Sequence, residues 1–126
     1  MKLKTIEYSL TGSKTEVKVI LEKDEVVVEA MVSGSNTRFN TQRILSTATL
    51  RATERFLEKD DLFLFEDVKV VNIAGDDVVV VSVVAMESGH EKRLFGCAHV
   101  TRDLNESVVR ATLNAINRRI TLYINS

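Results

Sequence analysis

The sequence contains no proline and no tryptophan, only one cysteine (Cys97), and few aromatic residues, which make up 6% of the chain. Without proline there is no rigid linker or strong break, so we expect a single domain over residues 1–126. One cysteine excludes an internal disulfide and fits a reducing compartment, so we expect a cytoplasmic protein. No segment reaches the roughly 18 apolar residues that span a bilayer, so we expect no membrane partner.

An excess of charge of either sign is also lacking. The chain has 17 lysines and arginines against 18 aspartates and glutamates, which gives a net charge of −1. Nucleic-acid coats and polybasic membrane anchors depend on concentrated positive charge, so this balance argues against both. With 44% apolar and 28% charged residues, the composition is that of a folded globular protein.

What the sequence does contain is a repeated pattern. The stretch EVVVEAMVSG (Glu25–Gly34) resembles DVVVVSVVAMESG (Asp77–Gly89), and each precedes an amphipathic segment that contains the tripeptide Arg-Ala-Thr. The valine runs align at an offset of 52, whereas the tripeptides, which begin at Arg51 and Arg110, differ by 59. Pairing Gly34 with Gly96 is the alternative, and we prefer it because each half then has three strands followed by one helix.

Alternation of polar and apolar residues predicts the strands. A half-buried strand shows this period of two, and β-branched residues favour it. The expected strands are Ile6–Leu10, Glu16–Leu21, Val26–Val32, Leu62–Ile73, Val78–Met86 and Lys92–Thr101. The last segment, Thr121–Ser126, is also rich in β-forming residues, so we expect a short extended tail.

Helical spacing of apolar residues appears twice. The first helix is expected to begin near Thr41, with Asn40 or Thr41 as its N-cap, and to end near Glu58. The second follows Asp103 or Asn105, either of which can cap it. Alanines on both helices allow close approach to a sheet or to each other.

The predicted fold class is therefore α+β, with two βββα units over residues 1–59 and 60–126. We expect an antiparallel-rich sheet with both helices packed on one face and a pseudo-twofold relation between the units. The run Val78–Val84 is apolar on both sides of its strand, and such strands are normally covered on both faces. A second copy of the chain could supply that cover, which predicts a homo-oligomer, while a strongly curled sheet is the alternative.

This pattern resembles the C-terminal regulatory domain of the 2-isopropylmalate and citramalate synthases. The residues that carry the resemblance are Glu29–Gly34 before the first helix, then Leu94–Val100, Asn105–Ala111 and Ala115–Asn117 in the second half. The resemblance implies tandem βββα units that dimerise. It also implies that an end-product amino acid or keto acid binds near the junction of the units.

Arginines on the two helices are the candidate ligand-binding residues. Arg51 and Arg110 stand in the repeated tripeptide, and Arg55 lies one turn beyond Arg51. If the helices pair about a pseudo-twofold axis, Arg51 and Arg110 could hold a carboxylate or phosphate between them. A solvated helix face with acidic neighbours is the alternative for these residues.

Catalytic and metal-binding patterns are weak. Cys97 and His99 would share one strand face, and His90 lies in a separate turn, so no third ligand or catalytic partner is in place. A lone cysteine in a strand is usually a small buried apolar residue. The glycines are isolated and form no phosphate-binding loop. We therefore expect no enzymatic activity, no catalytic residues, no metal and no cofactor.

The sequence-based hypothesis is a non-catalytic regulatory module that binds a small anionic metabolite between its halves. A structural module that oligomerises or docks a protein partner, without ligand, is the alternative. RNA binding through the same arginines is a weaker one, because the lysine-rich helix start expected of a double-stranded-RNA-binding fold is missing.

Overall fold

The computed structural model describes residues 1–124. Two units of the same order, three strands and then a helix, follow one another along the chain, and a short helix ends it. The elements are β1 (Lys2–Thr11), β2 (Lys14–Lys23), β3 (Val26–Ser35), α1 (Arg38–Leu57), β4 (Phe63–Ile73), β5 (Asp76–Glu87), β6 (His90–His99), α2 (Leu104–Asn117) and α3 (Ile120–Ile124). The predicted α+β class and the two βββα units are confirmed.

The strands form two antiparallel sheets. The first sheet has the order β1-β2-β3 and the second the order β4-β5-β6. Alternation explains which face of each sheet is buried: Val17, Val19 and Leu21 of the central strand β2 point inward and are fully buried. The expectation of one continuous sheet is therefore wrong. The strands of each unit pair only with one another, which gives two sheets.

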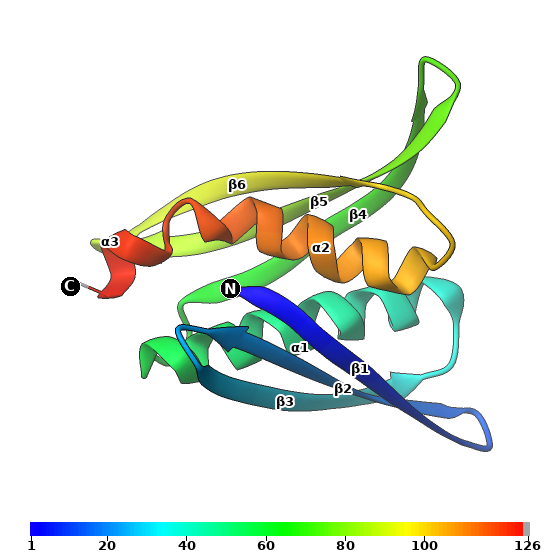
Figure 1. Ribbon diagram of the computed structural model, residues 1–126, viewed down its shortest axis with the longest axis horizontal. Coiled ribbons are helices and arrows are strands. Elements are labelled where there is room, and N and C mark those ends of the chain that lie inside the picture. The colour runs from blue at the N-terminus through cyan, green and yellow to red at the C-terminus, as the bar shows by residue number, and fades with distance from the viewer. Residues whose placement is uncertain (125–126) are drawn as a thin grey trace.

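Both helices lie between the two sheets (Figure 1). Helix α1 packs on β2 and β3, helix α2 packs on β5 and β6, and the two helices contact each other. One apolar core therefore runs from sheet to sheet through the helix pair. The outer face of each sheet is left without a covering element of this chain (Figure 1).

The repeat is visible in the strand pairing. A β-bulge interrupts the β1–β2 pairing between Leu3 and Thr5, and another interrupts the β4–β5 pairing between Phe65 and Asp67. Both pairs of numbers differ by 62. The N-caps of the two long helices, Thr37 and Asp103, differ by 66. The first two strands of the units are thus related by one offset, and the helices by another.

The longer offset arises in the β5–β6 hairpin. Met86 pairs with Glu91 and Glu87 with His90, which extends this hairpin by four residues relative to the β2–β3 hairpin. The structural counterpart of Gly96 is consequently Ala30, so the expected pairing of Gly34 with Gly96 is wrong for the third strands.

The pseudo-twofold relation between the units passes through the contact of α1 with α2. Ser46 and Thr112 differ by the same 66 positions as the helix caps, both are fully buried, and their hydroxyls lie 2.9 Å apart. Because the Thr112 hydroxyl donates to the Val108 carbonyl, Ser46 is the donor of this hydrogen bond. The two counterparts therefore meet at the centre of the molecule.

Two boundaries differ from the expected ones. Helix α1 begins at Arg38, because the Thr37 hydroxyl accepts the N–H of Asn40 as an N-cap, so the expected cap at residue 40 or 41 is wrong. The expected extended tail is instead the helix α3 over Ile120–Ile124, since a helical turn buries both Ile120 and Tyr123. Residues 125 and 126 of that tail lie outside the described part of the chain.

Candidate functional site

The three predicted arginines lie in three different environments. Arg51 pairs with Glu54 and donates to the Phe63 carbonyl at 3.0 Å. Arg55 donates to the Glu29 carbonyl of β3 at 2.6 Å. Arg51 and Arg55 therefore serve to attach α1 to neighbouring strands.

Arg110 is the exception, because it lies at the junction of the two units. It forms an ion pair with Glu106 one turn earlier on α2. Its counterpart under the 66-residue offset is Ile44, so the expected equivalence of Arg51 and Arg110 is wrong. The two Arg-Ala-Thr tripeptides are 59 positions apart, whereas the two helices are related by 66. The tripeptides are therefore not at equivalent positions of the two helices.

Arg51 belongs to a buried connection between α1 and β4. The side chain of Glu54 is only 6% exposed and accepts the N–H groups of Leu62 and Phe63 at 2.9 and 2.8 Å. Arg51 compensates the charge of this carboxylate. The cluster ends α1 and starts the second unit, so its role is structural.

A groove runs between the edge strand β1 and helix α2, and we call it the β1–α2 groove. It consists of two adjoining cavities of about 250 Å³ each, and Leu3 and Arg110 line both of them. The full lining is Leu3, Lys4, Thr5, Ile6, Tyr8, Asp103, Glu106 and Arg110 in one cavity, and Met1, Lys2, Leu3, Arg110, Leu113, Asn114 and Asn117 in the other. The groove thus takes residues from both units.

Two aromatic residues pack together at the symmetry-related junction, between β4 and α1. Phe39 and Phe65 pack edge to face there with ring centroids 6.3 Å apart. Under the two offsets their counterparts are Asn105 and Leu3, which are smaller. Leu3 lines the β1–α2 groove, and the Asn105 side chain hydrogen-bonds with Tyr8, which also lines it. The fold therefore has paired rings at one junction and a groove at the other.

Polar contacts at the two junctions are also related. Arg51 donates to the Phe63 carbonyl, and its counterpart Asn117 donates to the carbonyl of Met1, the counterpart of Phe63, at 3.0 Å. These matching bonds connect each long helix to the start of the other unit.

Charges of both signs line the β1–α2 groove. Arg110 supplies positive charge, and Asp103 and Glu106 supply negative charge, whereas the ammonium group of Lys4 pairs with Glu22. One oxygen of Asp103 caps α2 by accepting the N–H of Asn105 at 3.0 Å. Such a lining can bind a small molecule that carries both a carboxylate and an ammonium group.

Tyr8 gives the groove a partly buried hydroxyl. Burial raises the pKa of Tyr8 above its usual value, while a hydrogen bond with the Asn105 side chain acts in the opposite direction. Tyr8 therefore remains protonated at neutral pH and can donate a hydrogen bond. Its ring supplies apolar surface beside the charged residues.

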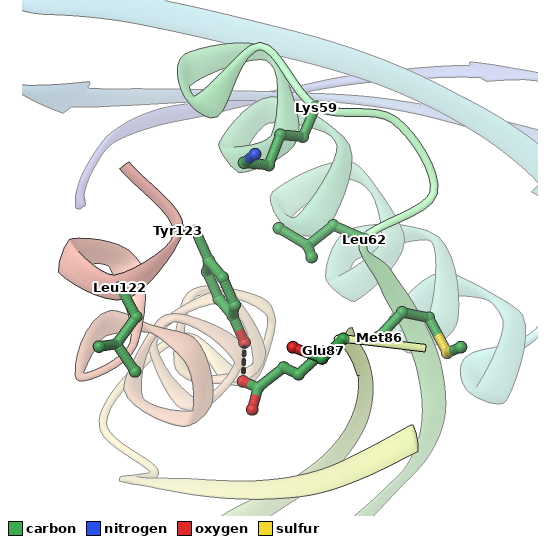
Figure 2. Close-up of a pocket in the computed structure, with 7 residues that line it drawn as sticks. Lys59, Leu62, Met86, Glu87, Leu122 and Tyr123 are labelled. Carbon is green, nitrogen blue, oxygen red and sulfur yellow. Dashed lines mark hydrogen bonds between the residues drawn. The ribbon is translucent and has the colours of Figure 1, made fainter. Parts of the chain in front are cut away.

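A second cavity, of about 310 Å³, lies at the end of the β5–β6 hairpin (Figure 2). Its lining is Lys59, Leu62, Met86, Glu87, Ser88, Leu122 and Tyr123. It forms where the units differ most, since the extended hairpin and α3 have no equivalents in the first unit. It is the largest of the cavities described, and its carboxylate, Glu87, is bound by neighbouring side chains.

Glu87 anchors α3 to the hairpin. It accepts two hydrogen bonds of 2.7 Å from Arg119. It also accepts one from the Tyr123 hydroxyl, which Figure 2 shows. The Arg119 bonds hold the pKa of Glu87 at about 2, well below its ordinary 4.5. Burial, with the bond to Glu87, raises the pKa of Tyr123 to about 12. This carboxylate is thus ionised and engaged at neutral pH.

Replacing Glu87 by glutamine is expected to lower the free energy of unfolding by about 1–2 kcal/mol at pH 7, because bonds to a charged group are lost. The pKa of Glu87 is lower in the folded chain, so its contribution is complete above about pH 5 and is lost as the pH falls towards 2. Urea unfolding at several pH values measures this. The difference between wild type and Glu87→Gln should shrink with acidification.

Glu91→Gln is the matched control for this prediction. Glu91 is exposed on the same hairpin, so its replacement should change stability by less than about 0.5 kcal/mol. A Glu87→Gln effect that stays constant between pH 7 and pH 3 would contradict the assigned role of the carboxylate.

The remaining candidate metal ligands and catalytic residues do not lie together in one site. Among residues 1–124, no group of three or more His, Cys, Asp or Glu residues is placed to hold a metal ion. His99 lies 3.7 Å from Asp76 at the exposed end of β6. Cys97 is exposed on the second sheet, so the expectation of a buried thiol is wrong. Its side chain lies on the outer face of β6, opposite to the buried face.

Comparison with known proteins gives no family for this chain. No protein-family model matches it, and no curated protein matches it at a significant level. Among the residues that the structure describes, no helix combines the length and the apolar character needed to cross a membrane.

Sequence reasoning missed several residues that shape the groove and the second cavity. Tyr8 and Asp103 come together from opposite ends of the chain, and no local pattern links them. Glu87 could be suspected only from its position before a Ser-Gly turn. The single useful signal was the arginine at position 110.

Proposed function

We propose that this chain is a non-catalytic regulatory module that binds a small metabolite through its carboxylate group, best an amino acid, in the β1–α2 groove. The observation that carries the proposal is the asymmetry of the junctions: Phe39 and Phe65 pack together at one of them, and the other carries the β1–α2 groove. An open junction between otherwise repeated units is a suitable place for a ligand that holds the units together. A cytoplasmic location belongs to the same proposal.

Charge placement supports an amino acid over a simple dianion. Arg110 donates from Nε and Nη2 to Glu106, and its other edge, with Nη1 and the second Nη2 hydrogen, can hold a ligand carboxylate in a bidentate arrangement. Asp103 and Glu106 can accept hydrogen bonds from an ammonium group. The apolar side chains of Leu3 and Ile6 can contact the remainder of the ligand. The resemblance to the synthase regulatory domain points to the same class of ligand.

A thermal-shift screen of amino acids, keto acids and nucleotides tests the proposal. A ligand at 100 times its Kd stabilises the folded chain by about 2.7 kcal/mol, which corresponds to a rise of several degrees in Tm. We expect such a rise with one or more amino acids. In the Arg110→Ala variant this rise in Tm should be absent, or the apparent affinity for the ligand should be at least tenfold lower.

Arg55→Ala is the matched control, because Arg55 lies on α1 and donates to β3, away from the groove. It should respond to the ligand as the wild type does. A flat response across the whole panel would refute ligand sensing, and an equal loss in both variants would refute the placement in the groove.

A structural oligomerisation module is the second candidate function. It is favoured by a separate observation, the apolar outer face of the second sheet.

A further inference from the structure

The outer faces of the two sheets differ in chemistry although they are equivalent in the repeat. Each central strand presents alternate residues to the outside. At the equivalent outward positions β2 has Glu16, Lys18, Ile20 and Glu22, and β5 has Val78, Val80, Ser82 and Val84. Three charged positions in the first sheet are therefore valines in the second.

The outer face of the first sheet is suited to water. Lys18 lies within 3.8 Å of Glu7 and 3.2 Å of Glu29, and Lys4 lies within 3.6 Å of Glu22. These pairs connect neighbouring strands across the face. Exposed ion pairs add little stability, but they cover the strands with charge.

No element of the described chain covers the outer face of the second sheet, and the middle of this face is apolar, with Val78, Val80 and Val84 partly exposed. Leu64 on β4 is 63% exposed and Phe95 on β6 is 58% exposed, and both flank the valines of β5. Val71, Val80 and Phe95 line a shallow depression of about 220 Å³ on this face. We call this surface the β5 face.

Charge on the β5 face is balanced within the chain. Glu66 accepts hydrogen bonds from Arg93, at 2.9 Å, and from Ser82. Asp67 and Lys69 add one charge of each sign at the edge of the depression. Such a surface carries both signs without an excess of positive charge, so it does not suit a nucleic acid or an anionic membrane.

The size of the β5 face is sufficient for a weak to moderate dimer. With 12 residues in β5 and about 3.4 Å per residue, the sheet is about 40 Å long, and three strands about 4.8 Å apart make it about 14 Å wide. The projected area is at most about 550 Å² per copy, or about 1,100 Å² for two, because β4 and β6 are shorter than β5. This lies at the low end of specific interfaces.

From these observations we infer that the β5 face binds the β5 face of a second copy of this chain, which forms a twofold dimer. The valines of β5 are then buried on both sides, as is usual for a strand without polar alternation. The inference is independent of the β1–α2 groove, which lies between β1 and α2 and not on an outer sheet face.

Light scattering coupled to gel filtration tests the dimer. At about 100 μM the wild-type chain should have twice the monomer mass of 14.1 kDa. The double variant Val80→Lys with Val84→Glu gives the β5 face the residues that stand at the equivalent positions of the first sheet. It should elute as a monomer with an unchanged circular dichroism spectrum.

The control places the same kind of change on the other sheet. Ile20→Lys with Met31→Glu adds charges to the outer face of the first sheet, and this variant should remain dimeric. A monomeric wild type at this concentration would overturn the inference, as would a β5-face variant that stays folded and dimeric. If that variant is unfolded, Phe95→Ser provides the second test, since Phe95 is mostly exposed and its loss should raise the dimer Kd at least tenfold without unfolding the chain.

Discussion

Replacing Gly96 by alanine is expected to lower the free energy of unfolding by about 3 kcal/mol, because the added methyl group overpacks the contact between β6 and α2. A Cβ at this position would lie 2.2 Å from the Ala111 carbonyl oxygen and 2.3 Å from the Ala115 backbone nitrogen. Both neighbours are backbone atoms and cannot rotate away. The helix or the strand must therefore shift. Urea unfolding followed by circular dichroism measures the loss.

Gly34→Ala is the control for this prediction. A Cβ there would meet only the side chains of Arg43 and Ile44, each at 3.4 Å. We expect a change of less than about 1 kcal/mol, since a methyl group in ordinary contact also reduces the freedom of the unfolded chain. Equal stability of the two alanine variants would show that α2 does not pack on the Gly96 backbone as described.

Replacing Glu54 by alanine is expected to cost about 3 kcal/mol. The carboxylate is buried, pairs with Arg51 and accepts the N–H groups of Leu62 and Phe63, so its removal leaves two buried donors and a cation without their partner. The link from α1 to β4 is weakened, which affects both units. Thermal and urea unfolding measure the loss.

Glu106→Ala is the matched control, because Glu106 also pairs with an arginine on its own helix. The side chains of Glu106 and Arg110 are 39% and 56% exposed, so their pair should contribute less than about 1 kcal/mol. If the two variants lose the same stability, burial of the Glu54 cluster is not the source of its effect.

Much of the fold could be predicted from the sequence because it depends on local periodicity. The alternation of Glu16–Leu21 identifies β2 and its buried face, and the Val78–Met86 run identifies β5. The division into two sheets could not be predicted. Whether strands of different units pair depends on where the helices pack. The sequence of a strand shows its buried face but does not show which strand lies beside it.

The candidate site was less predictable than the fold. Arg110 was selected because it stands in a repeated tripeptide, but the repeat does not relate it to Arg51, since its structural counterpart is Ile44. Arg110 lies at the groove because its part of α2 faces β1. The four additional residues of the β5–β6 hairpin change the offset, and only the observed pairing of Glu87 with His90 reveals this. Tyr8 and Asp103 are distant in sequence, so their proximity is a property of the folded chain alone.

The hydrogen bond from Ser46 to Thr112 has a consequence for the symmetry of the chain. A hydroxyl carries one hydrogen, and the two hydroxyls use theirs in different directions: Thr112 towards Val108, and Ser46 towards Thr112. In a symmetric dimer of two identical units, the two equivalent hydroxyls could form this hydrogen bond in either direction, and the two directions would be equally populated. Covalent connection of the units allows one direction to be specified, with serine as the donor and threonine as the acceptor at the centre of the molecule.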